Sequence, residues 1–217
     1  MANPGWYDNF APIYDAGTLW DWFYRAPREC AIDSLELHQG SSVFDIFCGT
    51  GINFPLLMPA MGTGGRIFAI DGSSGMLEKA QRRADRLELM ESQIGFLKTD
   101  LSSGTGVAAL CTAVEQRRPS HLLFTLGLTC LPNWCEFTDA VIQASPQGAR
   151  LSIMDVYSEK STQGARFINW IGAADCRRPI WQPLERQCES FVWREFRPFK
   201  ILDVSVIVAS GTIPARV

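Results

Sequence analysis

The sequence predicts an α/β fold: an open, mostly parallel sheet of seven strands with helices on both faces and an antiparallel hairpin at the C-terminal end. The main observation is that short apolar runs alternate with helical segments along most of the chain. The last two apolar runs, 190–196 and 202–210, follow each other with only a short link, which suits a hairpin. With 217 residues, 47% of them hydrophobic, the chain can build one such domain around a sizeable core.

The elements follow from local patterns. Apolar runs rich in β-branched and aromatic residues predict strands over 43–47, 66–71, 94–100, 122–126 and 150–156. Helices are expected over 28–37, 52–61, 75–90, 107–116 and 160–174, with a further one ending near Ser145. Ser73 or Ser74 is the expected N-cap of the helix over 75–90. Residues 175–189 contain two prolines and are expected to be irregular.

The first 40 residues are predicted to form an aromatic, helical cap rather than part of the sheet. Eight aromatic residues fall within nineteen positions, namely Trp6, Tyr7, Phe10, Tyr14, Trp20, Trp22, Phe23 and Tyr24. Trp20, Phe23 and Tyr24 have the spacing of one helix face, and Pro27 follows them. This face either packs on the core or closes as a lid over a ligand, and the sequence leaves both readings open.

We expect a single domain over residues 1–217. Its parts are the cap (1–40), a ligand-binding core (41–156), an insertion on the substrate side (157–189) and the C-terminal hairpin (190–217). The net charge of −3 gives no electrostatic reason to expect a nucleic-acid partner. Oligomeric state is left open.

Composition also limits the compartment and the metal chemistry. Seven cysteines, an odd number without a CxxC pair, favour reduced thiols in the cytoplasm. The two histidines, His38 and His121, have no partner at ligand spacing, so no metal is expected. No apolar run is long enough to span a bilayer, and no secretory signal is visible, although transient contact with a membrane surface stays open.

The turn Cys48-Gly49-Thr50-Gly51 is the clearest candidate for a binding element. It joins the strand over 43–47 to a helix, so it directs backbone N–H groups and the positive end of the helix dipole to one point. Gly49 and Gly51 can adopt positive φ and allow a ligand to approach the backbone.

Two acidic residues end the strands that follow this turn. Asp71 ends the second strand, 20 residues after Gly51, where a βαβ nucleotide site holds a ribose diol. Asp100 ends the third strand. Because parallel strands end at the same edge of a sheet, these side chains and the glycine turn are expected to form one site.

Taken together, these residues resemble the class I S-adenosylmethionine-dependent methyltransferases, whose Rossmann-like fold agrees with the predicted sheet. The resemblance rests on Asp45-x-x-x-Gly49-x-Gly51, on Asp71-Gly-Ser-Ser-Gly-Met76-Leu77, and on Asp100-Leu101. The opening Tyr7-Asp8-x-Phe10-Ala11-x-x-Tyr14-Asp15 is similar to the ubiquinone/menaquinone-type branch. One departure is Phe47, where the family usually has glycine, so the first turn should be arranged differently or the cofactor shifted.

The resemblance implies S-adenosyl-L-methionine as cofactor and S-adenosyl-L-homocysteine as product. It implies that Asp71 binds the ribose hydroxyls, that Asp100 accepts from the adenine amino group, and that Met76 and Leu101 pack on the ring. The cofactor-binding residues that it implies are Tyr14, Asp45, Gly49, Gly51, Asp71, Gly72, Met76, Asp100, Leu101, Thr125 and Leu126. Gly49 and Gly51 would approach the methionine part, Thr125 and Leu126 the sulfonium methyl, while Asp45 can instead fix the loop.

A narrower resemblance concerns the methyl acceptor. The segment from Thr125 to Trp134 is similar to the post-strand loop of phosphatidylethanolamine N-methyltransferases and betaine-lipid synthases. It implies methyl transfer to a small molecule or lipid headgroup at an amine nitrogen. The candidates for contact with the reacting amine are Tyr14, Trp134 and Tyr157, because aromatic faces attract a developing positive charge.

Two alternatives stay open. An O-methyltransferase of a small natural product would need a base, and His38 and His121 are expected at the opposite edge of the sheet. Asp15 and Asp155 are candidate bases, and either can instead be a local hydrogen-bond anchor. A protein of this fold that binds the cofactor without transferring a methyl group is the second alternative.

Overall fold

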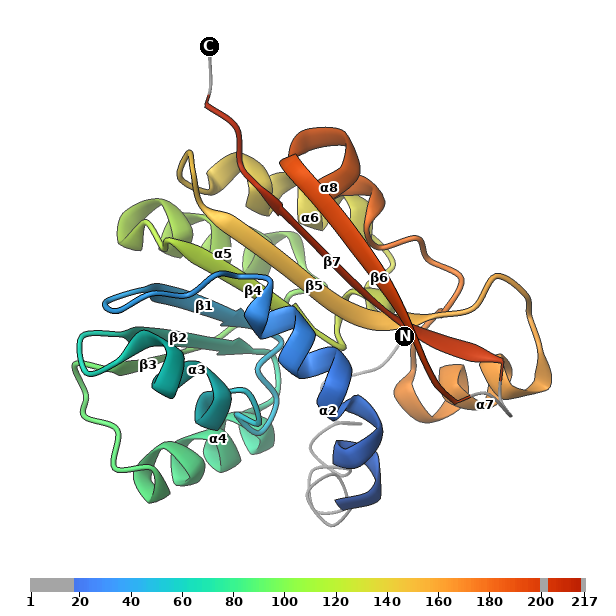
Figure 1. Cartoon of the computed structure of the whole chain (residues 1–217), viewed down its shortest axis with the longest axis horizontal. Coiled ribbons are helices and arrows are strands. Elements are labelled where there is room, and N and C mark those ends of the chain that lie inside the picture. The colour runs from blue at the N-terminus through green and yellow to red at the C-terminus, as the bar shows by residue number, and fades with distance from the viewer. Residues whose placement is uncertain (1–17, 200–202, 216–217) are drawn as a thin grey trace.

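The computed structural model describes residues 18–199 and 203–215, which form one seven-stranded sheet with the order β3-β2-β1-β4-β5-β7-β6 (Figure 1). Five strands run parallel: β1 (Ser42–Ile46), β2 (Arg66–Asp71), β3 (Ile94–Lys98), β4 (His121–Thr125) and β5 (Arg150–Tyr157). The antiparallel hairpin consists of β6 (Glu189–Phe199) and β7 (Val204–Thr212), with β7 inserted between β5 and β6. The predicted sheet and its C-terminal hairpin are confirmed.

Helices cover both faces of the sheet (Figure 1). One face is covered by α2 (Thr18–Asp33), α3 (Phe54–Met61), α4 (Ser74–Arg86) and α7 (Gln163–Gly172), and the other by α5 (Gly104–Arg117), α6 (Trp134–Ala144) and α8 (Gln182–Gln187). Buried apolar side chains form one cluster on each face. Along β1, Val43 belongs to the first cluster and Phe44 to the second, as the alternation of a strand requires.

Two predicted elements are wrong. Pro27 does not separate two helices, because α2 continues through it from Thr18 to Asp33. The segment 175–189 is not irregular throughout, since α8 forms within it. Pro183 lies in the first turn of α8, where a missing N–H breaks no helical hydrogen bond.

The strand order places a crevice at the carboxyl ends of β1 and β4. The chain runs from β1 outward to β2 and β3, and then returns to add β4 on the other side of β1. Ligands of open α/β sheets bind at such a switch point. Ser73 fixes the start of α4 beside this crevice, because its hydroxyl accepts a hydrogen bond from the N–H of Met76 at 3.2 Å, as the prediction of a serine cap required. In the part of the chain that the structure describes, no helix is long and apolar enough to cross a bilayer.

Candidate functional site

A cavity of about 160 Å³ lies at the carboxyl ends of the central parallel strands. Its wall combines the glycine turn, the ends of β2 and β4, the start of α4, the loop after β3 and one side chain of α2. The lining residues are Arg28, Phe47, Cys48, Gly49, Thr50, Ile52, Asp71, Gly72, Ser73, Met76, Asp100, Leu101, Ser102, Thr125, Leu126, Gly127, Cys130 and Leu131. The predicted edge of the sheet is therefore where the structure places a cavity.

Two non-glycine residues at this cavity adopt a left-handed backbone. Phe47 has φ of 62° and Leu126 has φ of 56°, each directly after its strand. Such conformations cost energy and concentrate at binding sites. The ring of Phe47 packs towards Phe137 at 5.7 Å between centroids. It also fills the space beside Gly127, where an added Cβ would lie 2.1 Å from the Phe47 ring. Phe47 thus takes the positive φ of a glycine while its side chain forms part of the cavity wall.

Asp71 holds the glycine turn and the start of α4 together. Its Oδ2 accepts a hydrogen bond from the N–H of Gly49 at 2.9 Å, and its Oδ1 accepts one from the N–H of Ser73 at 2.9 Å. A carboxylate can accept about four hydrogen bonds. The side chain can therefore order both loops and still accept hydrogen bonds from a ligand in the cavity.

Directly beneath the cavity lies a buried polar chain that links α2, β1, α3 and β4. Arg28 donates to the side-chain oxygen of Asn53 at 2.6 Å, and Asn53 donates to Asp45 Oδ1 at 2.7 Å and to Thr125 Oγ1 at 3.1 Å. Asp45 is fully buried, and its Oδ2 has no hydrogen-bond partner among the described residues. Burial raises the pKa of Asp45 to about 7, although the hydrogen bond from Asn53 and the charge of Arg28 oppose the shift.

The acidic end of the cavity is formed by the loop after β3. Asp100 Oδ1 accepts hydrogen bonds from the N–H of Ser102 at 3.0 Å and from its hydroxyl at 2.6 Å. Met76 and Leu101, both buried, line the same cavity with apolar surface. A flat apolar group with polar edges can bind between these residues.

The structure brings most of the predicted cofactor-binding residues together. Eight line the cavity: Gly49, Asp71, Gly72, Met76, Asp100, Leu101, Thr125 and Leu126. Asp45 and Gly51 do not line it. Gly51 is required by packing, since its φ is 76° and a Cβ there would lie 2.5 Å from the buried ring of Phe54. Tyr14 lies outside the described residues.

The described aromatic candidates for contact with the acceptor do not line this cavity. Trp134 begins α6 and packs against the second core cluster, and Tyr157 packs against Trp181 with 4.8 Å between ring centroids. Trp170 is 69% exposed on α7. The rings of His38 and His121 lie 5.7 Å apart at the start of β4, which is the opposite edge of the sheet, as predicted.

Sequence reasoning missed Arg28, which is 6% exposed and lines the cavity from α2. Its partner Asn53 is 25 residues away, and no spacing in the sequence indicates the pair. Among residues 18–199 and 203–215, no three His, Cys, Asp or Glu side chains are grouped as a metal site would need.

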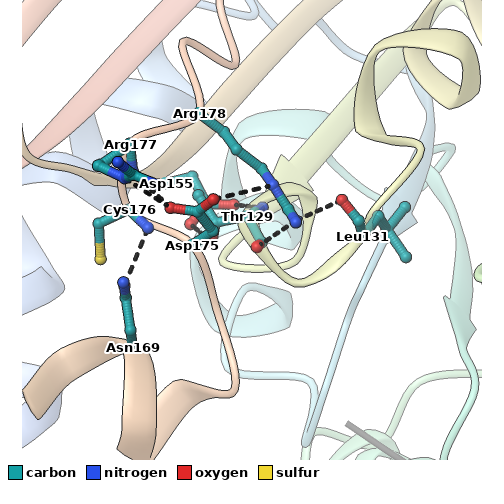
Figure 2. A network of polar contacts seen from close by, with 8 residues as sticks. All are labelled: Thr129, Leu131, Asp155, Asn169, Asp175, Cys176, Arg177 and Arg178. Carbon is teal, nitrogen blue, oxygen red and sulfur yellow. Dashed lines mark hydrogen bonds and ion pairs between the residues drawn. The ribbon is translucent and has the colours of Figure 1, made fainter. Parts of the chain in front are cut away.

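A second polar network fixes the loop after β4 (Figure 2). Asp155, at the end of β5, accepts from the N–H of Thr129 at 3.1 Å and from its hydroxyl at 2.8 Å. Arg178 donates to the carbonyl oxygens of Thr129, at 2.6 Å, and of Leu131, and also pairs with Asp175. Asp155 is thus a local hydrogen-bond anchor, and burial raises its pKa. The network sets the position of Leu131, which lines the cavity.

We expect Arg178→Met to destabilise the protein by about 2–3 kcal/mol, because it removes hydrogen bonds from a cation to two backbone carbonyls. Arg177→Met is the matched control. Arg177 is 61% exposed and lies 3.6 Å from Asp175, so its loss should cost well under about 1 kcal/mol. Urea unfolding of both variants measures the difference, and equal losses would contradict a specific role for Arg178.

Comparison with known proteins places this geometry in a family. The family model for protein-L-isoaspartate(D-aspartate) O-methyltransferases matches residues 26–114. The 2-phytyl-1,4-naphtoquinone methyltransferase of Thermosynechococcus vestitus is 32% identical over 166 residues, which are 76% of this chain and 68% of that protein. A 37.1 kDa transposon protein of Streptomyces fradiae is 33% identical over 75 residues, which are only 22% of its length.

Solved structures agree with the fold at low identity. Geranyl diphosphate C-methyltransferase from Streptomyces coelicolor superposes with a TM-score of 0.69 and 10% identity, covering 87% of this chain and 77% of that one. Phosphoethanolamine N-methyltransferase 2 from Haemonchus contortus gives a TM-score of 0.68 and 8% identity, covering 98% of this chain and 58% of that one. These solved structures support the fold alone. The quinone-methyltransferase relative, 32% identical over 76% of this chain and 68% of its own length, shows that the chain belongs to the class I S-adenosylmethionine-dependent methyltransferases.

Proposed function

We propose that this protein transfers a methyl group from S-adenosylmethionine to an amine nitrogen of a small molecule or lipid headgroup. The observation that carries the proposal is the cavity in which Asp71, Asp100 and the glycine turn meet at the carboxyl edge of the sheet. S-adenosylmethionine, when bound, supplies an electrophilic methyl group on a sulfonium. The residues of this chain then have to bind, align and exclude water.

The chemistry of the cavity lining fits this cofactor. Asp71 would accept from the ribose hydroxyls in addition to the N–H groups of Gly49 and Ser73, and Asp100 would accept from the adenine amino group. Met76 and Leu101 give the apolar surface for the adenine ring. Gly49 has a φ of 53° and open space on the side where a Cβ would stand, which favours close approach of a ligand to the backbone.

In this proposal the residues next to α2 would hold the methionine end of the cofactor. Arg28 lines the cavity from α2, and its guanidinium would complement the carboxylate of the methionine part, for which arginine is the preferred partner. Thr125 and Leu126, which also line the cavity, would contact the part of the cofactor that carries the methyl group. Tyr14 and Gly72 remain expected contacts of the cofactor, whereas Gly51 does not line the cavity and is explained by its packing on Phe54.

We propose a nitrogen acceptor because the described lining of the cavity offers no evident general base for a hydroxyl acceptor. No histidine is among the described residues that line the cavity, and Asp71 and Asp100 already accept hydrogen bonds from loop groups. A hydroxyl acceptor needs proton removal by a nearby base, whereas a neutral amine attacks without one. Burial raises the pKa of the Cys48 thiol well above its usual range, so this lining thiol stays protonated.

A naphthoquinone-like acceptor is the second candidate. Its support is the similarity to 2-phytyl-1,4-naphtoquinone methyltransferase, together with the apolar part of the cavity wall formed by Phe47, Leu126 and Leu131. This acceptor is apolar and uncharged, so its methylated product differs in charge from a methylated amine, and ion exchange measures that difference.

Labelled methyl transfer tests both candidates. The purified protein is incubated with methyl-labelled S-adenosylmethionine and a cell extract, and the products are separated into organic and aqueous phases and passed over a cation exchanger. Labelled product that the cation exchanger retains supports an amine acceptor. If this retained product comes from the organic phase, the amine belongs to a lipid. Labelled product in the organic phase that passes through supports the quinone-like acceptor. Binding of S-adenosylhomocysteine without labelled product would contradict methyl transfer to any acceptor in the extract.

A further inference from the structure

A second cavity, of about 550 Å³, lies beside the C-terminal hairpin. It is formed by the end of β5, the loop that follows it, the residue before α8, and strands β6 and β7. None of its lining residues also lines the first cavity. Tyr157, the last residue of β5, lines the second cavity and lies two residues after Asp155, whose network with Thr129 and Arg178 is drawn in Figure 2.

Three aromatic rings line this second cavity, one on β5, one directly before α8 and one on β6. Tyr157 meets Trp181 edge-to-face with 4.8 Å between ring centroids and an interplanar angle of 80°. Trp181 and Trp193 are stacked with 5.7 Å between centroids and an angle of 10°. Trp193 is 47% exposed, so part of this aromatic surface is accessible. Trp181 also packs against the second core cluster, so the rings connect the core to the exposed edge of the cavity.

The charges around the rings favour a cation. The lining contains three carboxylates, Glu159, Glu195 and Asp203, against two cations, Lys160 and Arg197. Glu195 is held in place, since it accepts hydrogen bonds from Arg197 at 3.0 Å and from the hydroxyl of Ser205 at 2.5 Å. These hydrogen bonds, that from Arg197 first, hold the pKa of Glu195 below its usual value, so the carboxylate is ionised at neutral pH.

We propose that this second cavity binds an alkylated ammonium cation. The faces of aromatic rings carry negative charge density and attract cations, most strongly at tryptophan. An ammonium group that carries methyl groups has apolar surface to bury against such rings and few or no N–H groups to satisfy. The three rings and the surplus carboxylate match these properties, whereas an anion would face a net negative lining. The site is separate from the cavity proposed for S-adenosylmethionine, and it binds without chemistry.

Choline and its uncharged isostere, 3,3-dimethylbutan-1-ol, are the probes that test this proposal. The full chain is labelled with ¹⁵N in its tryptophan side chains, and each probe is titrated while the indole N–H signals of the seven tryptophans are followed by NMR. We expect saturable shifts of the Trp181 and Trp193 signals with choline, and binding of the isostere about tenfold weaker, because only choline carries the charge.

Variants assign the effect to the cavity. Trp193→Leu should weaken choline binding about tenfold, and Glu195→Gln should weaken it about threefold. Both residues are on the surface strand β6, and circular dichroism checks that the variants are folded. Trp170→Leu is the matched control, since Trp170 is exposed on α7 and does not line this cavity. Its choline affinity should equal that of the parent.

Three results would overturn the proposal. The isostere could bind as tightly as choline, which would make the cavity merely apolar. Trp193→Leu could leave choline affinity unchanged. Saturating S-adenosylhomocysteine could abolish the choline shifts, which would assign choline to the first cavity. The readout is binding alone, so failure of the proposed methyl transfer would not alter it.

Discussion

Asp71→Asn is expected to weaken the binding of S-adenosylhomocysteine by about 100- to 1,000-fold. In the proposed site the Asp71 carboxylate accepts two hydrogen bonds from ribose hydroxyls, and hydrogen bonds to a charged group contribute about 1.5–3 kcal/mol each. Two of them account for about 3–6 kcal/mol. Asparagine keeps one acceptor oxygen, so we expect a loss at the lower end, about 3–4 kcal/mol, and each 1.4 kcal/mol is about tenfold in affinity. Isothermal titration calorimetry with the parent and the variant measures the ratio.

The substitution also affects the loops that Asp71 orders. An asparagine has one acceptor oxygen, so it cannot accept from both Gly49 and Ser73 as the two carboxylate oxygens do. The melting temperature must therefore be measured with the affinity. Asp85→Asn, the same change at an exposed position of α4, is the control and should leave affinity unchanged. If folded Asp71→Asn binds within threefold of the parent, Asp71 does not hold the ribose.

The site's local elements could be predicted because their signals lie within a few residues. The apolar run of β2 ends in Asp71 at the predicted position, and Ser73 caps α4 because serine is a preferred N-cap residue. The hairpin followed from the shortness of its link. These features depend on interactions between residues that are close together in the sequence, so local sequence patterns predict them.

Long-range packing decided the elements that were predicted wrongly. Proline lacks the N–H for one helical hydrogen bond and costs about 3 kcal/mol inside a helix, so Pro27 indicated a boundary. In the structure α2 continues, and its apolar face, which includes Ala31 and Ile32, packs into the core against β5 and β7. Burial of that face outweighs the lost hydrogen bond, and the sequence pattern near Pro27 does not contain this information.

The positions of individual site residues also depend on long-range packing, which local sequence patterns do not reveal. Arg28 lines the cavity because α2 packs beside α3 and β4, and Asn53, the residue before α3, links it to Asp45 on β1. Trp134 and Tyr157 were chosen by residue type and nearness to strand ends. The direction of their side chains depends on α6 and on Trp181, to which no local signal points.

The buried chain beneath the cavity makes stability depend on pH, and Asp45→Asn should remove that dependence. Burial, opposed by Asn53 and Arg28, raises the pKa of Asp45 from 3.8 to about 7. Below about pH 4 the carboxyl is protonated in both the folded and the unfolded chain, so it imposes no charge penalty. Between about pH 4 and 7 the unfolded chain releases the proton while the folded chain keeps it. The free energy of unfolding therefore falls as pH rises, by about 4 kcal/mol in total.

Asparagine at position 45 keeps an oxygen to accept from Asn53 but carries no charge at any pH. Its amide nitrogen replaces Oδ2, which has no hydrogen-bond partner among the described residues. A buried N–H group without a partner costs about 1–3 kcal/mol, and this cost does not vary with pH. Urea unfolding from pH 4.5 to 8 should show the variant gaining on the parent by a few kcal/mol as pH rises. Asp85→Asn should show no such gain. Parallel curves for the parent and Asp45→Asn would mean that Asp45 ionises normally in the folded protein, with Arg28 and Asn53 together supplying the solvation that burial removes.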